Sequence, residues 1–85
     1  MFYVYLLKLN NGDIYKGMTA NIKQRINEHK AGKVTSTKSF LPVKLIAYEA
    51  YLLKSDAERR ERFLKTTEGR RLLKQQYRDI ILKSD

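Results

Sequence analysis

Five polar side chains of this sequence stand where a purely hydrophobic pattern would not place them. Two tyrosines lie on the first two expected strands, an arginine and a histidine follow one helical turn apart, and a glutamate falls in the apolar stripe of a later helix: Tyr5, Tyr15, Arg25, His29 and Glu61. Phenols and imidazoles can move protons, a guanidinium can stabilise phosphate charge, and a carboxylate can hold a hard metal ion. Together they are suited to cleaving a phosphodiester bond with one divalent metal.

Glu61 gives the strongest physical argument. It follows Ala57 and precedes Leu64 on the inward stripe of an expected helix, where a carboxylate is costly unless it is paired or metal-bound. Magnesium is typically held by one or two carboxylates together with water and substrate oxygens, so a single acid suffices. The alternative is a salt bridge to a neighbouring arginine, which Arg25 could supply.

The other four candidates also have ordinary structural explanations. Strand tyrosines commonly pack in the core, a surface arginine is usually solvated, and a lone helical histidine is more often structural. His29 is the only histidine, which excludes a metal site built from several histidines. A free phenol has a pKa of about 10, so a tyrosine that acts as a base needs a nearby cation.

The two tyrosines share a face of the sheet in only one register of the first hairpin. Residues 2–9 and 14–18 are rich in aromatic and aliphatic side chains and predict two strands joined by a turn. A two-residue turn would put Tyr5 and Tyr15 on opposite faces. A three-residue loop with Gly12 in the left-handed conformation puts both on one face, and we predict this register.

The remaining elements are helices and one more strand. Thr19 or Asn21 can cap a helix that ends at Gly32, and a capping box at Ser55 opens a second helix. We expect the first helix to end at about residue 31 and a strictly alternating third strand to span residues 44–51. The second helix should end at about residue 65, and a single last helix should run from about residue 70 to at least residue 81. The order β-β-α-β-α-α predicts an α/β (α+β) fold, with helices flanking a small three-stranded antiparallel sheet in one domain, residues 1–85.

The charge of the chain indicates its partner class. The net charge is +9, with eight Lys/Arg against three Asp/Glu in residues 1–51 and ten against six in residues 52–85. This spread favours nucleic acid over a membrane surface. The chain has no cysteine for a disulfide or a thiolate zinc site, and neither a signal peptide nor a membrane-spanning run is evident, so we expect a cytoplasmic protein.

Eight further basic residues are candidates for phosphate contacts. Such contacts position a nucleic acid without reading its sequence, and each residue alone is ordinarily a solvated charge. The candidates are Lys16, Lys33, Lys38, Arg59, Arg62, Arg70, Arg71 and Lys74.

The motifs and their spacing resemble the GIY-YIG nuclease superfamily over nearly the whole chain. The match is most like its short stand-alone bacterial members, and it extends to the N-terminal domain of excinuclease C. The matching segments are Tyr3-Val4-Tyr5, Tyr15-Lys16-Gly17, the helix with Arg25 and His29, and Arg60-Glu61-Arg62. The chain departs from the family pattern at Tyr3, Val4 and Lys16. It has no asparagine after Asn27 to match the late one of larger members, and we expect no additional DNA-binding domain.

The resemblance implies a metal-dependent endonuclease that acts on DNA rather than RNA. It implies Mg²⁺ or Mn²⁺ held by Glu61, and Arg25 at the scissile phosphate. One of the two tyrosines would relay the water proton while the other positions water or phosphate, and the sequence leaves their assignment open. The small surface favours structure-selective or weakly selective cleavage, and one site cuts one strand. Cutting a duplex would thus need a homodimer, a larger protein partner or two encounters.

Two other functions stay open. The chain could be a nucleic-acid-binding module that has kept the fold and lost turnover, or a small subunit that needs a larger partner for targeting. Salt-dependent binding without cleavage would favour the first. Binding only after a partner is added would favour the second.

Overall fold

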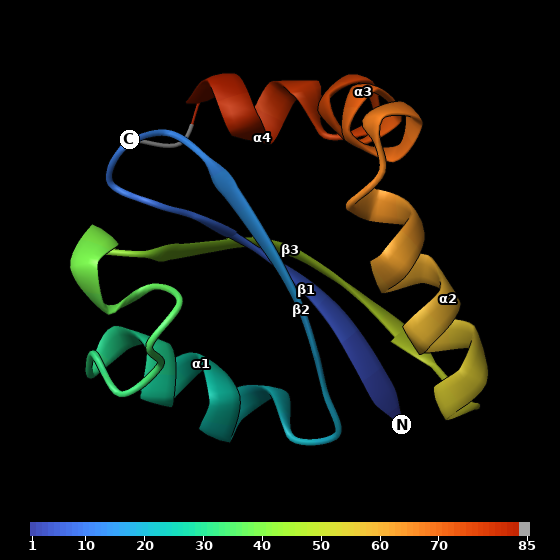
Figure 1. The fold of residues 1–85 in the computed structure, drawn as a ribbon, viewed down its shortest axis with the longest axis horizontal. Helices are drawn as coiled ribbons and strands as arrows, with labels where there is room; N and C mark the ends of the chain where they lie inside the picture. The colour runs from blue at the N-terminus through green and yellow to red at the C-terminus, as the bar shows by residue number, and fades with distance from the viewer. Residues whose placement is uncertain (84–85) are drawn as a thin grey trace.

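A computed structural model describes residues 1–83 as a three-stranded antiparallel sheet with helices on both faces (Figure 1). The elements are β1 (Phe2–Lys8), β2 (Ile14–Thr19), α1 (Ile22–Lys30), the 3₁₀ turn η1 (Lys38–Phe40), β3 (Lys44–Tyr51), α2 (Lys54–Leu64), α3 (Thr67–Gln76) and α4 (Arg78–Lys83). The strand order is β2-β1-β3, so β2 lies at an edge. The predicted fold class is confirmed. Residues 84 and 85 of the predicted domain lie outside the described residues.

The hairpin between β1 and β2 has the predicted three-residue loop. The Leu9 amide donates to the Asp13 carbonyl oxygen at 2.9 Å, and the Gly12 amide donates to that of Leu9 at 3.0 Å. Gly12 has a φ of 90°, the left-handed conformation that the loop requires. Tyr5 therefore pairs with Gly17, and the predicted register is confirmed.

The pairing of β1 with β3 contains an irregularity that the sequence did not reveal. Leu6 pairs with Ala47 whereas Leu7 pairs with Leu45, so Ile46 is an extra residue on β3. Such a bulge shifts the inside-outside alternation by one position. Leu45 and Ala47 consequently pack in different clusters, and the strict alternation expected for residues 44–51 is wrong at this point.

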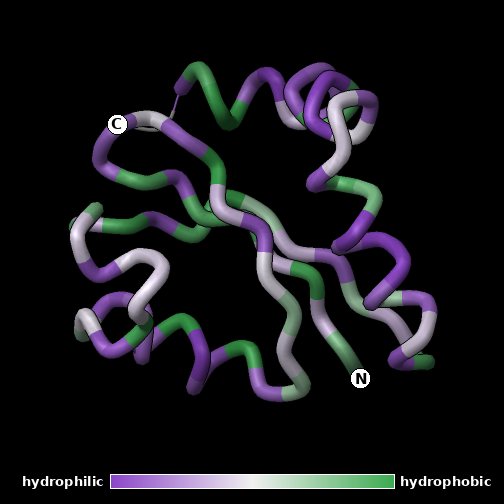
Figure 2. Tube along the Cα trace, in the orientation of Figure 1, coloured by the Kyte–Doolittle hydropathy of each residue, from purple (hydrophilic) through white to green (hydrophobic). Residues whose placement is uncertain are grey.

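The sheet separates two hydrophobic clusters. On the face of α2 and α3 the buried members are Val4, Leu6, Ala57, Leu64 and Leu73, and on the face of α1 they are Tyr5, Leu7, Ile26 and Val43. Figure 2 shows this pattern as green segments where the strands cross, with purple dominating α2. Among residues 1–83, no helix has both the length and the apolar character needed to cross a bilayer.

Two helix boundaries differ from the prediction. Asn21 caps α1 as expected, because its side-chain oxygen accepts from the Gln24 amide at 3.1 Å. The capping box predicted at Ser55 is wrong: α2 begins at Lys54 and its cap residue makes no side-chain hydrogen bond. The prediction of a single last helix is also wrong, because α3 ends before Tyr77 and a separate helix, α4, follows it.

A network around Glu49 holds α2 and the end of α3 to β3. The Glu49 carboxylate accepts two hydrogen bonds from Arg60, at 2.9 and 3.1 Å, and one each from the hydroxyls of Tyr51 and Tyr77, at 2.6 and 2.7 Å. Burial raises the pKa of Glu49, but these bonds outweigh burial and set that pKa below its ordinary value. Burial and the bond to Glu49 raise the pKa of each tyrosine to about 12. Because Arg60 directly precedes Glu61, the network also fixes the α2 backbone next to Glu61.

Candidate active site

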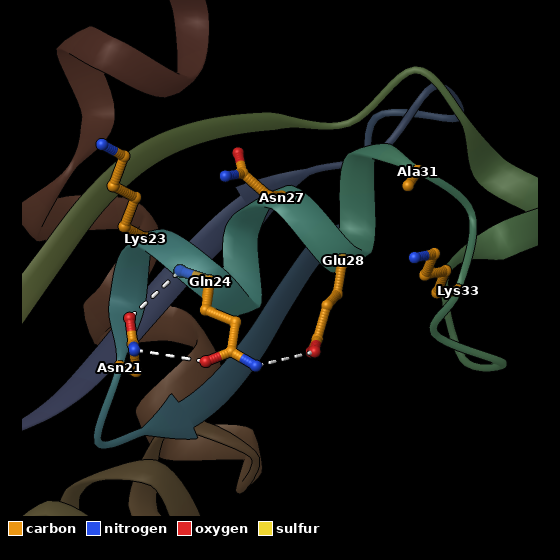
Figure 3. A pocket seen from close by; sticks show the side chains of 7 residues that line it. All are labelled: Asn21, Lys23, Gln24, Asn27, Glu28, Ala31 and Lys33. Atoms are coloured by element: carbon orange, nitrogen blue, oxygen red, sulfur yellow. Dashed lines mark hydrogen bonds between the residues drawn. The ribbon is translucent and has the colours of Figure 1, made fainter.

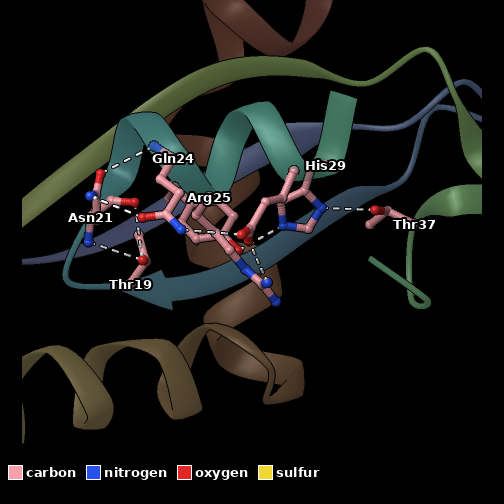
Figure 4. Close-up of polar contacts among 8 residues, drawn as sticks. Thr19, Asn21, Gln24, Arg25, His29 and Thr37 are labelled. Atoms are coloured by element: carbon pink, nitrogen blue, oxygen red, sulfur yellow. Dashed lines mark hydrogen bonds and ion pairs between the residues drawn. The ribbon is translucent and has the colours of Figure 1, made fainter. Parts of the chain in front are cut away.

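Tyr5 lies at the centre of the candidate site. Its side chain projects from β1 toward α1 and the residue is 1% exposed. The Tyr5 hydroxyl is 2.8 Å from Nε2 of His29, which is also fully buried. On the other side of the ring, Nδ1 of His29 is 2.8 Å from the Thr37 hydroxyl (Figure 4). Each ring nitrogen of His29 thus has a hydroxyl that can donate or accept, so either neutral tautomer is satisfied.

Thr37 is the site residue that sequence reasoning missed. It lies in a polar loop between α1 and η1 and is completely buried. A threonine in such a loop carries no periodic signal. Its contact with His29 depends on how the loop folds back over α1.

Gly17 provides the space in which the Tyr5 ring lies. A Cβ atom at Gly17 would stand 2.4 Å from both Cζ and the hydroxyl oxygen of Tyr5, closer than real side chains approach. The glycine of the second motif is therefore required by the position of the first motif's tyrosine. Its role is steric, since it leaves the edge-strand backbone bare beneath that ring.

Tyr15 completes a cluster of three rings on this face. Its ring centroid is 6.3 Å from that of Tyr5 and 5.2 Å from that of His29. The prediction that the two tyrosines share a face is confirmed by this packing. Tyr15 is partly exposed and, within residues 1–83, makes no side-chain hydrogen bond, so its hydroxyl can take a new partner.

Arg25 lies at the open side of the cluster. Its guanidinium pairs with Glu28 on the same helix at 3.1 Å, and 38% of its side chain is exposed. Burial raises the pKa of Tyr5, the nearby Arg25 guanidinium lowers it, and the charges of Tyr15 and Glu61 raise it again. The net direction is upward, so Tyr5 keeps its proton at neutral pH. Arg25 can reach an anion without leaving the site.

Glu61 lies on α2. Its carboxylate is close enough to raise the pKa of Tyr5, although α2 packs on the opposite face of the sheet. The ion pair that it forms is with Lys65, at 3.7 Å, and not with Arg25. An exposed pair of this length is worth little, so the carboxylate is available to another cation. Tyr5, Tyr15 and His29 thus pack together on the α1 face, while Arg25 and Glu61 lie near enough for their charges to affect the pKa of Tyr5.

The donor set fits a metal held by a single carboxylate. Residues 1–83 contain no group of three or more histidine, cysteine or acidic side chains placed to bind one ion. This rules out a closed protein cage within the described chain, but not a magnesium-type site that takes most ligands from water and substrate. Glu61 is the residue that would hold such an ion.

The buried histidine predicts a pH dependence of stability. Burial and the nearby Arg25 charge hold the pKa of His29 below its ordinary value, with Glu28 acting in the opposite direction. The unfolded chain, whose histidine has a pKa of about 6.5, then binds more protons than the folded one. We expect the free energy of unfolding to be greatest above about pH 6.5 and to fall as the pH drops toward the lower folded pKa.

Urea denaturation of the wild type and of His29→Gln between about pH 5.5 and 7.5 measures this effect, because no other histidine contributes. An NMR titration of the His29 ring checks it independently. A ring pKa at or above about 6.5 would contradict the expectation.

Substituting Gly17 should displace the Tyr5 ring. We expect Gly17→Ala to lower the free energy of unfolding by about 2 kcal/mol, because a methyl group must be forced into packed space. Cleavage should fall about 100-fold, because a shift of roughly 1 Å misplaces reacting groups. Thermal denaturation and a cleavage assay measure the two effects. Gly12→Ala is the matched control: it meets no atom within 4 Å but strains a positive φ, so it should lower stability without affecting the cleavage rate of the folded protein.

The predicted phosphate contacts do not form one surface. Lys16, on β2, lines a hollow under the hairpin together with Arg70 and Lys74 of α3. Arg59 and Arg71 are paired with acids on their own helices, at 2.9 and 2.7 Å. The others, Lys33, Lys38 and Arg62, are exposed on separate elements.

A hollow on the outer side of α1 is a poor candidate for the chemistry. Figure 3 shows its lining, which is contributed by Asn21, Lys23, Gln24, Asn27, Glu28, Ala31 and Lys33. It lies on the side of α1 that faces away from Tyr5. Of the predicted residues, only Lys33 lines it.

Comparison with known proteins identifies the family. A profile described as the GIY-YIG catalytic domain matches residues 1–77. The chain belongs to the GIY-YIG family. All five candidate residues fall within the matched region. Membership supports a nuclease role in general, and GIY-YIG nucleases generally use divalent metal ions.

The relatives of this GIY-YIG chain are short proteins. A UPF0213 protein of Streptococcus agalactiae serotype V is 41% identical over 64 residues, which cover 74% of this chain and 73% of the relative. One of Staphylococcus haemolyticus is 41% identical over 73 residues, 85% and 89% of the two chains. The solution NMR structure of a UPF0213 protein from Bacillus halodurans has a TM-score of 0.55 and 32% identity, and the match covers 86% of this chain and 82% of that one.

Proposed function

We propose that this GIY-YIG protein is a metal-dependent endonuclease that hydrolyses phosphodiester bonds in DNA, with structure-selective or weakly selective cleavage. The observation that supports the proposal most is the packing of two phenols and an imidazole on one face of the sheet, with a guanidinium and a carboxylate near enough to affect the pKa of Tyr5. The net charge of +9 suits a polyanionic substrate.

The two tyrosines have different surroundings and therefore different proposed roles. Tyr15 is partly exposed and has a free hydroxyl, so it can lose its own proton to solvent beside a cation, and the resulting phenolate then contacts the attacking water and takes up the water proton. Tyr5 is buried, bonded to His29 and kept protonated by its raised pKa, so it holds the site in shape. His29 and Thr37 fix the orientation of the Tyr5 hydroxyl.

Arg25 and Glu61 handle the negative charge. Arg25 donates to oxygens of the scissile phosphate, where charge builds up in the transition state. A divalent ion held by Glu61 would supply Lewis-acid stabilisation of the phosphate oxygens. Both side chains affect the pKa of Tyr5, and this supports a reacting phosphate bound between them.

A cleavage assay tests the proposal. Purified protein is incubated with labelled single-stranded, duplex, flapped and Y-shaped DNA and with matching RNA, in Mg²⁺ or Mn²⁺ and in chelator, beside Arg25→Ala. Metal-dependent cutting of a DNA form that is lost in the variant is the expected result. Binding without cutting by either protein would instead establish an inactive binding module.

A further inference from the structure

A hollow lined by basic side chains lies beneath the first hairpin, on the face of β2 opposite Tyr15. We call it the cationic hollow. Lys16 pairs with Leu6 of β1 and so projects to the face covered by α2 and α3. Arg70 and Lys74 follow one helical turn apart on α3, and the three line a hollow of about 390 Å³. Its floor includes the apolar residue Leu73.

The cationic hollow is lined by three cations and by one acid, Asp13. Within residues 1–83, none of the three cations forms an ion pair. Burial, and after it the charges of Arg70, Lys74 and Lys65, hold the pKa of Lys16 below its ordinary value, and Asp13 is the acid that opposes them. Repulsion of this kind is relieved when an anion binds between the cations. By contrast, Arg59 and Arg71 already have acidic partners.

The cationic hollow adjoins the candidate active site through Lys65. This residue pairs with Glu61 at 3.7 Å and also lies close enough to Lys16 to affect its pKa. Because β2 is an edge strand, a substrate strand can pass over its open side from Gly17 to Lys16.

We propose, building on the nuclease function above, that Lys16, Arg70 and Lys74 bind the backbone of the strand being cut, at phosphates that flank the scissile one. The substrate strand crosses the edge of β2, with the reacting phosphate on one face and a bound phosphodiester on the other. The subsite is independent of base identity, because it offers only ammonium and guanidinium groups to the backbone.

Salt-dependent binding tests the subsite without requiring cleavage. The full chain binds a labelled single-stranded oligonucleotide in chelator, and fluorescence anisotropy gives the affinity over a range of KCl concentrations. Lys16→Gln combined with Lys74→Gln should reduce the slope of log affinity against log salt by about 1.4, or about 0.7 for each lost contact. The control, Lys23→Gln with Lys30→Gln on the exposed outer side of α1, removes the same charge. Equal changes in the two variants would overturn the proposal.

Neutral linkages locate the bound phosphate. Oligonucleotides with one methylphosphonate at successive positions should weaken binding about tenfold at a single position in the wild type and have no effect there in the Lys16/Lys74 variant. Arg70→Gln with Lys74→Gln, both exposed on α3, provides a second variant should Lys16 prove necessary for folding. If no position of the methylphosphonate weakens binding, the proposal is overturned. It is also overturned if inorganic phosphate binds in the hollow and the oligonucleotide does not displace it.

The experiments separate the two proposals. A wild type that binds without cutting refutes the nuclease function, while the slope and the linkage series still decide the subsite. If the wild type cuts, and the Lys16/Lys74 variant shows the same change in salt dependence as the Lys23/Lys30 control, only the subsite is refuted.

Discussion

Glu61→Gln should lower the rate of metal-dependent cleavage on the order of 1,000-fold, because Lewis-acid stabilisation is worth several kcal/mol and each 1.36 kcal/mol changes the rate tenfold. Glutamine has nearly the same shape but no charge to hold a divalent cation. Stability should hardly change, since the carboxylate's ion pair is a 3.7 Å contact to the half-exposed Lys65. Single-turnover cleavage and thermal denaturation measure the two quantities.

Glu58→Gln, on the same helix, is the matched control and should retain activity. Metal binding gives a further readout: Mn²⁺ should broaden the NMR signals of Tyr5 in the wild type but not in Glu61→Gln. Cleavage by the variant at the wild-type rate would show that the carboxylate has no catalytic part.

The two tyrosines should respond differently to loss of the hydroxyl. Tyr15→Phe should reduce cleavage on the order of 1,000-fold, within the range for a positioned proton acceptor, and leave the free energy of unfolding unchanged. Tyr5→Phe leaves Nε2 of His29 buried without a partner and should lower the free energy of unfolding by about 1–3 kcal/mol. Single-turnover kinetics and urea denaturation of both variants compare the effects.

Tyr48→Phe is the control for removing a phenol from the sheet, because Tyr48 is 56% exposed and lies outside the cluster. If Tyr5→Phe alone abolished cleavage without loss of stability, the proposed roles of the two tyrosines would have to be exchanged.

Local chemistry made much of this fold predictable. The three-residue loop at Gly12 fixes the register, and the register determines that Tyr5 lies over Gly17 and on the face of Tyr15. The Asn21 cap and the stop at Gly32 are likewise properties of a few neighbouring residues. The roles of the five site residues remain predictions, although the structure packs three of them, Tyr5, Tyr15 and His29, against one another.

The features that escaped prediction depend on distant parts of the chain. The bulge at Ile46 reflects how β3 fits clusters on both faces of the sheet. Alternation could mark Glu49 for burial, but its partners Arg60 and Tyr77 lie 11 and 28 residues away. Thr37 has no pattern around it and is defined only by its contact with His29.

The position of β2 at the sheet edge also limits how two copies of the chain could act together. An edge strand ordinarily offers its free backbone groups to another chain. On β2 such pairing would cover the sheet edge beside Lys16, over which the proposed substrate strand passes. A dimer joined through β2 is therefore incompatible with the proposed chemistry. Separate molecules acting on a duplex would break its strands one after the other, with a nicked intermediate between the two events.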